Sequence, residues 1–215
     1  MIITEDLGLI FEKAICILYE IDYKGTFKYS IDDAIKLKDR IYKLKELLPV
    51  NLRHIAINKN KYDFSYIDEN GNNNYLSAKT SKNNGKICPQ VIGQISKNKF
   101  CELFNLNKSI DLNGIKVFIE NSITLLLDAY IKNTFDCPII YYNKHKDKCL
   151  LIEIINEIIW TNYQITFSHK NKNKEWNESS IGEFQIHRNR DCIKFRWSIQ
   201  NLLNYFQSNF IIKEI

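Results

Sequence analysis

The chain has 215 residues, of which 45% are hydrophobic and 26% are charged, and its formal net charge is +5. This composition excludes an intrinsically disordered protein, and the length is sufficient for one hydrophobic core. No stretch approaches the roughly 20 apolar residues that a membrane span needs, and the first residues lack the pattern of a signal peptide. We therefore expect a cytoplasmic protein that makes no contact with a membrane.

Two helices and a β-hairpin are predicted in the first part of the chain. Apolar residues recur at helical spacing over residues 6–20 and again over residues 31–48. The period then changes to the alternation of a strand around Tyr62–Ile67. The turn sequence Asp68–Asn72 follows, and Tyr75–Thr80 has the pattern of a returning strand.

The remainder of the chain contains both helical and strand patterns. Helices are predicted over residues 97–104, 111–132 and 198–206. Strands are predicted over residues 138–142, 149–155, 163–169, 181–187 and 192–197, with a polar loop over residues 170–179. The class is therefore α+β or mixed α/β, and the lack of a repeat or linker predicts a single domain over residues 1–215. Six cysteines without a CxxC pair favour free thiols over disulfides or a zinc site.

The predicted hairpin carries side chains that suit the hydrolysis of a phosphodiester bond. That reaction needs a divalent cation and a base or a positive charge beside the scissile phosphate. Asp63 lies on the first strand, while Ser77 and Lys79 alternate on the second strand and therefore point to one face. Asp63 is the candidate Mg2+ ligand, and Lys79 is the candidate residue that orients or deprotonates the attacking water. Asp68 is an alternative acid, although a tight turn would hold it too far from Lys79.

The 20-residue sequence YDFSYIDENGNNNYLSAKTS resembles the active-site hairpin of the PD-(D/E)XK nuclease superfamily, and within it that of type II restriction endonucleases. This resemblance implies a restriction-endonuclease-like fold, in which a central mixed β-sheet is flanked by helices. It implies one nuclease domain, with the catalytic hairpin and helices at residues 1–108 and a strand-rich DNA-recognition part at residues 109–215. It also implies a Mg2+-dependent, sequence-specific endonuclease that cuts double-stranded DNA as a homodimer, without a small-molecule cofactor.

The hairpin departs from the family pattern at two positions. Tyr62 replaces the proline before the aspartate, and Ser77 occupies the position of the second acid, where a hydroxyl is a poor Mg2+ ligand. The resemblance implies that such members recruit an acid from a helix, and many carry a glutamate on the N-terminal helix. Glu12 and Glu20 are the candidates. Glu12 is preferred because it follows the apolar run Leu9–Phe11, although an ordinary exposed helix glutamate is the alternative.

Two basic blocks are candidates for contact with DNA. Residues 79–108 carry six lysines against one acid, and residues 183–197 contain a turn rich in Arg, Asn and His. Lysine and arginine neutralise phosphates, whereas Gln, Asn and Arg can read base edges. The predicted DNA-binding residues are Lys82, Lys86, Gln90, Gln94 and Lys97 in the first block, and His187, Arg188, Asn189, Arg190, Lys194 and Arg196 in the second. A solvated basic surface is the alternative for each block.

Two further functions stay open at this point. One is a non-catalytic DNA-binding protein in which Ser77 marks a lost acid, and the other is a nuclease that acts on RNA or on damaged DNA. An HNH-type site built on His187 and Asn189 is a poor fit, because the four histidines do not supply the further metal ligands that it needs.

Overall fold

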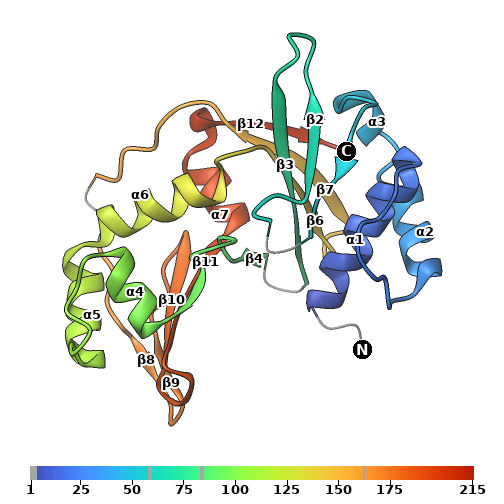
Figure 1. Cartoon of the computed structure of the whole chain (residues 1–215). Helices are drawn as coiled ribbons and strands as arrows, with labels where there is room; N and C mark the ends of the chain where they lie inside the picture. The colour runs from blue at the N-terminus through green and yellow to red at the C-terminus, as the bar shows by residue number, and fades with distance from the viewer. Residues whose placement is uncertain (1–3, 58–59, 83–84, 162) are drawn as a thin grey trace. The chain divides into compact units, whose positions relative to one another are not determined.

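The chain forms two compact units in the computed structural model, which describes residues 4–57, 60–82, 85–161 and 163–215 (Figure 1). Unit 1 comprises Met1–Asn84, Cys137–Ile155 and Phe210–Ile215, and unit 2 comprises Gly85–Asp136 and Asn156–Asn209. The units therefore interleave along the chain, and they do not follow the expected division at residues 108 and 109. No helix in the described part of the chain is long and apolar enough to cross a membrane.

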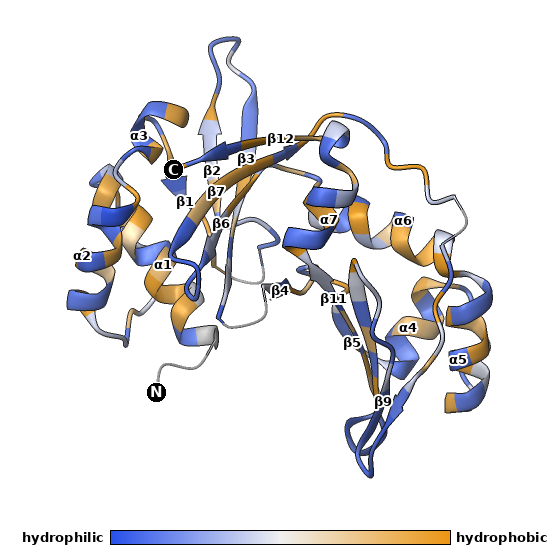
Figure 2. Cartoon of the chain, turned by 180° about the vertical axis from the view of Figure 1, so that it is seen from behind, coloured by the Kyte–Doolittle hydropathy of each residue, from blue (hydrophilic) through white to orange (hydrophobic). Residues whose placement is uncertain are grey.

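Unit 1 is built on a mixed six-stranded sheet of order β1-β2-β3-β6-β7-β12. Its strands are β1 (Arg53–His54), β2 (Phe64–Ile67), β3 (Asn73–Ser81), β6 (Ile139–Asn143), β7 (Lys148–Ile154) and β12 (Phe210–Glu214). Among the strand pairs of this sheet that the structure describes, only β3–β6 is parallel, and such a pair needs a long crossover connection. The first segment of unit 2 is inserted in that crossover. β6 is buried at every position, and Figure 2 shows its neighbour β7 largely in the hydrophobic colour.

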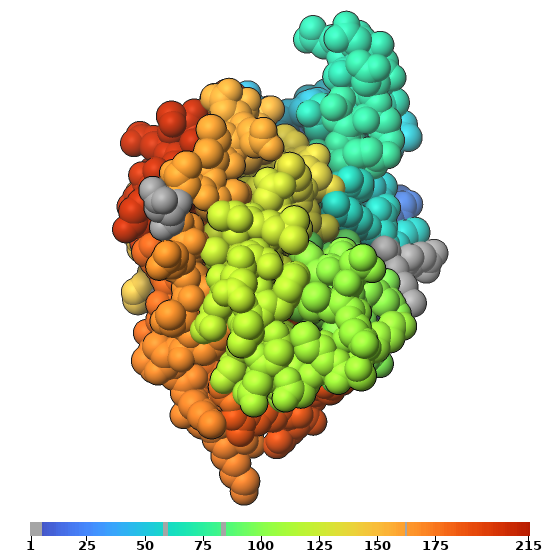
Figure 3. All heavy atoms as spheres, turned by 90° about the vertical axis from the view of Figure 1, so that its left-hand side faces the viewer, coloured from blue at the N-terminus to red at the C-terminus, as the bar shows by residue number. Residues whose placement is uncertain are grey.

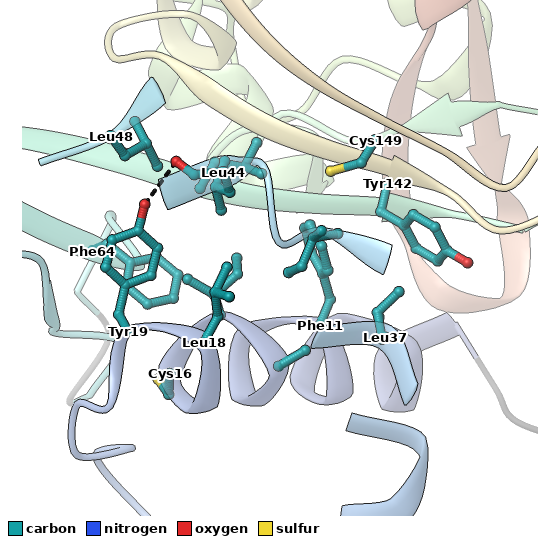
Figure 4. Packing of buried hydrophobic residues seen from close by; sticks show 14 of the residues in the cluster. Phe11, Cys16, Leu18, Tyr19, Leu37, Leu44, Leu48, Phe64, Tyr142 and Cys149 are labelled. Carbon is teal, nitrogen blue, oxygen red and sulfur yellow. Dashed lines mark hydrogen bonds between the residues drawn. The ribbon is translucent and has the colours of Figure 1, made fainter. Parts of the chain in front are cut away.

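Helices α1 (Thr4–Tyr19), α2 (Ile31–Arg40) and α3 (Leu44–Leu47) belong to the same unit. α1 contacts both α2 and β3. Figure 4 shows the buried side chains between these helices and the strands, among them Phe11 of α1 and Phe64 of β2, each fully buried. The Tyr19 hydroxyl donates a 2.8 Å hydrogen bond to the carbonyl of Leu44, so the buried phenol is satisfied. This core fixes α1 against the hairpin of β2 and β3.

Unit 2 contains an antiparallel sheet of order β4-β11-β10-β9-β8, with β5 also paired to β11. Its strands are β4 (Lys86–Ile87), β5 (Gln94–Ser96), β8 (His169–Lys170), β9 (Lys174–Trp176), β10 (Gly182–His187) and β11 (Cys192–Ser198). Its helices are α4 (Lys97–Leu103), α5 (Leu112–Asn121), α6 (Ile123–Thr134) and α7 (Ile199–Tyr205), with 3-10 turns η1 (Arg188–Arg190) and η2 (Gln207–Asn209).

An aromatic core joins the helices of unit 2 to one face of this sheet. Tyr130 of α6 stacks on Phe195 of β11 at 4.4 Å between ring centroids and meets Phe184 of β10 edge-on at 5.7 Å. The indole nitrogen of Trp197 donates to the hydroxyl of Thr134 at 2.9 Å. In Figure 3 the atoms of α4, α5 and α6, coloured green to yellow, form one continuous face of this unit. The opposite face of the sheet carries the polar side chains of β10 and β11.

The structure corrects several predicted elements. The helix expected over residues 31–48 ends at Arg40, and the helix expected over residues 111–132 divides at Ser122, whose φ of −119° is not helical. The strand expected over residues 163–169 is wrong except for His169. There Ile165 is buried, but the Phe167 N–H bonds the Glu120 carboxylate at 3.1 Å instead of a neighbouring strand. The expected polar loop over residues 170–179 contains β9 and the second residue of β8, and strands β1, β4, β5 and β12 have no counterpart among the predicted strands.

All six cysteines are free thiols, as the prediction of free thiols over disulfides expected. The mixed α/β class is confirmed as well, since mixed and antiparallel sheets occur together with helices.

Candidate functional site

The predicted hairpin is present and brings Asp63 beside the strand that carries Lys79. Phe64 pairs with Leu76, so the register places Asp63 opposite Ser77. The Asp63 N–H donates to the Leu76 carbonyl at 3.1 Å, and the Ala78 N–H donates to Asp63 Oδ2 at 2.7 Å. Asp63 is therefore held by the backbone of β3, and it is 6% exposed. Asp63 is therefore buried, unlike a typical aspartate of an edge strand or a turn, whose side chain is exposed to solvent.

Lys79 approaches the same carboxylate oxygen. Its Nζ lies 4.0 Å from Asp63 Oδ2, and its side chain is 15% exposed. Ser77 and Lys79 alternate along β3 and share one face, as the sequence predicted, and Ser77 is buried. The structure thus brings Asp63, Ser77 and Lys79 together in one small volume.

Glu12 supplies a second carboxylate from α1. Its side chain is 12% exposed, whereas Glu20 is exposed and lies just beyond the end of α1 with a φ of 57°. The pKa of Asp63 is raised to about 6, first by burial and further by the negative charge of Glu12, while Lys79 opposes the rise. Asp63 and Glu12 are largely buried carboxylates that repel each other, and a cation bound between them would reduce this repulsion.

His54 takes part in this cluster and was missed in the sequence. It lies on β1, is 2% exposed, and stacks on Tyr23 at 4.5 Å between ring centroids. Its Nδ1 accepts the Lys24 N–H at 2.9 Å, and its Nε2 lies 3.3 Å from Glu12 Oε2. Because Nδ1 accepts, the ring proton of the neutral imidazole is on Nε2 and is donated to Glu12. His54 therefore orients the Glu12 carboxylate.

No periodic pattern in the sequence marks His54. The contact joins residues 42 positions apart, and it depends on the pairing of a two-residue strand with β2. A lone histidine between polar and apolar neighbours is most often a core residue, so only the tertiary structure reveals this partner.

The donor atoms of the cluster suit a hard cation such as Mg2+. Mg2+ prefers oxygen ligands and is usually held by one or two carboxylates together with water and substrate phosphate. Asp63 and Glu12 provide two such carboxylates. Burial and, to a lesser extent, the charge of Glu12 raise the pKa of Asp63, and a bound cation would oppose both effects. Within the described ranges no group of three or more His, Cys, Asp and Glu side chains forms a preassembled metal cage. The residues therefore fit a site with few protein ligands.

The predicted DNA-binding residues of the first block are spread over both units. Lys82 is half-buried just after β3 in unit 1, and Lys97 is half-buried at the start of α4 in unit 2. Gln90 and Gln94 are exposed in unit 2.

Lys86 and Arg196 form an internal ion cluster that sequence analysis did not predict. Both contact the carboxylate of Glu183, which is 4% exposed, and Arg196 Nη2 lies 2.9 Å from Glu183 Oε1. These cations hold the pKa of Glu183 below its usual range, although burial acts in the opposite direction. Much of the positive charge assigned to DNA contact at these two positions is therefore compensated within unit 2.

Arg188 also has an internal partner. Its guanidinium bonds the buried carboxylate of Glu175, which Lys116 Nζ contacts at 2.6 Å from α5. By contrast, Asn189 and Arg190 are exposed on the η1 turn, and His187 and Lys194 are half-buried on the adjoining strands. In the turn between β10 and β11, Arg188 therefore has a structural role, whereas Asn189 and Arg190 are exposed to solvent.

Comparison with known proteins extends these observations. No protein-family model matches the sequence. The chain is similar to a type II restriction enzyme. This relative is CviAII of Paramecium bursaria Chlorella virus 1, and the two sequences are 43% identical over 219 aligned residues. The alignment covers 98% of this chain and 63% of the relative, so the chain spans less than two thirds of the relative's length, and the similarity includes both units.

Proposed function

We propose that this protein is a type II restriction endonuclease that uses Mg2+ to hydrolyse phosphodiester bonds in double-stranded DNA at a specific sequence. The observation that carries the proposal is the buried Asp63–Lys79 pair, with the Glu12 charge acting on the same aspartate. The similarity to a type II restriction enzyme supports the same conclusion over nearly the whole chain. We assign the hairpin to the PD-(D/E)XK type and unit 1 to a restriction-endonuclease-like fold.

Each residue of the cluster has a distinct role in this proposal. Asp63 and Glu12 would hold Mg2+, which when bound would stabilise charge on the phosphate and activate water. Lys79 is positioned by Asp63 to orient the attacking water and to stabilise negative charge on the phosphate. Ser77, buried opposite Asp63, contributes a hydroxyl and no charge, so Glu12 is the second acid. His54 is a positioning residue, because it contacts Glu12 and is stacked in the core.

Plasmid cleavage with and without Mg2+ tests the proposal. Wild type is expected to produce discrete fragments, and Asp63→Asn and Lys79→Ala are expected to produce none. Glu12→Gln should cleave weakly, with partial recovery at higher Mg2+. The matched controls are Asp39→Asn on α2 and Lys45→Ala on α3, since both side chains are exposed in unit 1.

Two outcomes would contradict this function. One is a wild type that cuts no DNA of varied sequence, and the other is normal cutting by both hairpin variants. Salt-dependent DNA binding without metal-dependent cutting would favour a non-catalytic DNA-binding protein. Preferential cutting of RNA or damaged DNA in a substrate panel would favour the other alternative.

We further propose that the enzyme acts as a homodimer, because a symmetric site requires one active site for each strand. Light scattering coupled to size-exclusion chromatography would measure the mass, and a monomer that cuts both strands at one rate would contradict this part of the proposal.

A further inference from the structure

Two turns of unit 2 lie side by side and form one polar surface, of which the sequence predicted only the part contributed by residues 187–190. One turn joins β8 to β9 and the other, which includes η1, joins β10 to β11; both lie at the lower end of this unit in Figure 1. Together they line a hollow of about 410 Å³. We call this the two-turn surface; its lining residues are Asn171, Asn173, Lys174, His187, Asn189 and Arg190.

Hydrogen bonds hold the two turns in a fixed relation. The Arg188 N–H donates to the Asn173 carbonyl at 2.9 Å, and Asn189 Nδ2 donates to Asn173 Oδ1 at 3.0 Å. Asn171 Oδ1 accepts the backbone N–H groups of Asn173 and Lys174, which shapes the first turn. A surface that is ordered before binding loses less conformational entropy when it meets a ligand.

Arg188 stabilises the arrangement of the two turns through an ion pair with a buried carboxylate. Its guanidinium bonds Glu175, which also contacts Lys116 of α5, so the β10–β11 turn is tied to β9 and to the helices. Arg188 and Lys116 compensate the negative charge of Glu175. They hold the pKa of Glu175 below its usual range, chiefly through the Lys116 hydrogen bond. The buried carboxylate therefore does little to neutralise the outer surface.

The outer surface keeps an excess of positive charge. Lys174 and Arg190 line the hollow, and none of its six lining residues is acidic. The pKa of His187 is lowered by burial and by four nearby cations, namely Lys174, Lys194, Arg190 and Arg196. Figure 2 shows the end of the unit around β9 in the hydrophilic colour, and in Figure 3 orange atoms of this end project at the bottom. Such a surface favours a polyanion.

The amides of this surface can distinguish bases. After the mutual hydrogen bond, Asn189 retains its Oδ1 acceptor and one N–H, while Asn173 retains both N–H donors. Asn can bond adenine through one donor and one acceptor, Arg can read guanine, and Lys contacts phosphate. None of the six lining residues is Phe, Tyr or Trp, whereas single-stranded nucleic acid is usually bound by stacking on such rings.

We infer that the two-turn surface contacts double-stranded DNA and contributes to sequence recognition, with Asn173 and Asn189 facing base edges and Lys174 and Arg190 contacting phosphates or guanine. The major groove, about 12 Å wide, admits a two-stranded β-ribbon, whereas the deep, narrow major groove of duplex RNA does not admit side chains. Arg188 and Glu175 act as positioning residues. The role in sequence recognition rests on the proposed nuclease function, whereas the binding of DNA by this surface does not.

The test combines a cleavage arm and a binding arm on the full chain. In the first arm, wild type and an Asn173→Ala/Asn189→Ala double variant cut a library of duplexes with randomised centres in the presence of Mg2+, and the ends are sequenced. The double variant is expected to cut the wild-type sequence roughly tenfold or more slowly, with relaxed preference at one or more positions and an unchanged Mg2+ requirement. Asn98→Ala, an exposed amide on α4, should behave as wild type.

In the second arm, binding of an ordinary DNA duplex is measured by fluorescence anisotropy as salt is varied. Lys174→Ala and Arg190→Ala should each weaken binding and reduce the slope of log affinity against log salt by about one, whereas Lys45→Ala should not. Circular dichroism melting would confirm that each variant is folded.

The two arms separate failure of this inference from failure of the proposed function. If wild type cuts a defined sequence and the double variant cuts the same sequence at the same rate, the recognition role is overturned. If wild type cuts nothing, the nuclease proposal fails, and unchanged duplex binding by Lys174→Ala and Arg190→Ala would then overturn this inference as well. Weakened binding in that case would still support the two-turn surface as a DNA contact. Tighter binding of an RNA duplex than of DNA would also overturn it.

Discussion

Asp63 should make the metal-free protein less stable than a variant in which its charge is removed. The carboxylate is 6% exposed, its pKa is raised to about 6, and the Glu12 charge contributes to the rise. An ordinary aspartate has a pKa near 3.9, so the difference corresponds to about 3 kcal/mol of unfavourable free energy when Asp63 is ionised. Asn keeps an oxygen to accept the Ala78 N–H and lacks the charge. We therefore expect Asp63→Asn to raise the free energy of unfolding by about 1–3 kcal/mol at neutral pH.

The pH dependence of this gain has a defined sign. Because the pKa is higher in the folded state than in the unfolded state, the folded protein binds the proton more tightly between about pH 4 and pH 6. The cost of the charge is thus fully present above about pH 6 and absent below about pH 4. The advantage of Asp63→Asn should follow the same course and vanish in acid.

Urea denaturation with a chelator present measures this prediction. Wild type and Asp63→Asn are compared near neutral pH and near pH 4, with Asp39→Asn as the exposed control, for which a change within about 0.5 kcal/mol is expected. Added Mg2+ should stabilise wild type by about 2.7 kcal/mol at a concentration 100 times its dissociation constant and should leave the variant nearly unchanged. A loss of stability in Asp63→Asn, or the same gain at both pH values, would refute the reasoning.

Three further predictions concern Lys79, His54 and Glu183. Lys79→Met should lower the cleavage rate by roughly 100-fold or more while DNA binding measured by anisotropy is retained; parallel losses of binding and cleavage would argue for a purely structural lysine. His54→Gln should raise the Mg2+ concentration for half-maximal cleavage by roughly 10-fold, with the rate largely recovered at saturating Mg2+. A slower rate at every Mg2+ concentration would indicate that His54 does not act through Glu12. Glu183→Gln should lower the free energy of unfolding by about 2–4 kcal/mol at neutral pH, because Lys86 and Arg196 lose a buried partner. Because the folded-state pKa of Glu183 is lowered, the difference in free energy of unfolding between wild type and Glu183→Gln should shrink when the pH falls through that pKa. Equal differences in denaturation at neutral and acidic pH would contradict this account.

The hairpin and its alternating residues follow from local sequence. A turn sequence between two segments of strand period sets the register, and period-two alternation then places Ser77 and Lys79 on one face. These relations involve residues close in the chain, so the pattern in the sequence is sufficient to predict them. The helix that carries Glu12 is predictable for the same reason, since its apolar face recurs every three to four residues.

Only the tertiary structure decides which charged residues are partners. His54 reaches Glu12 through the packing of α1 against the sheet, and Glu183 and Glu175 neutralise cations that in the sequence resemble free DNA contacts. The amide pair of Asn173 and Asn189 likewise depends on a strand, β9, that has no clear period of its own. The sequence shows which side chains are charged. Whether an opposite charge compensates each of them depends on burial and on contacts between residues far apart in the chain, which no local periodicity encodes.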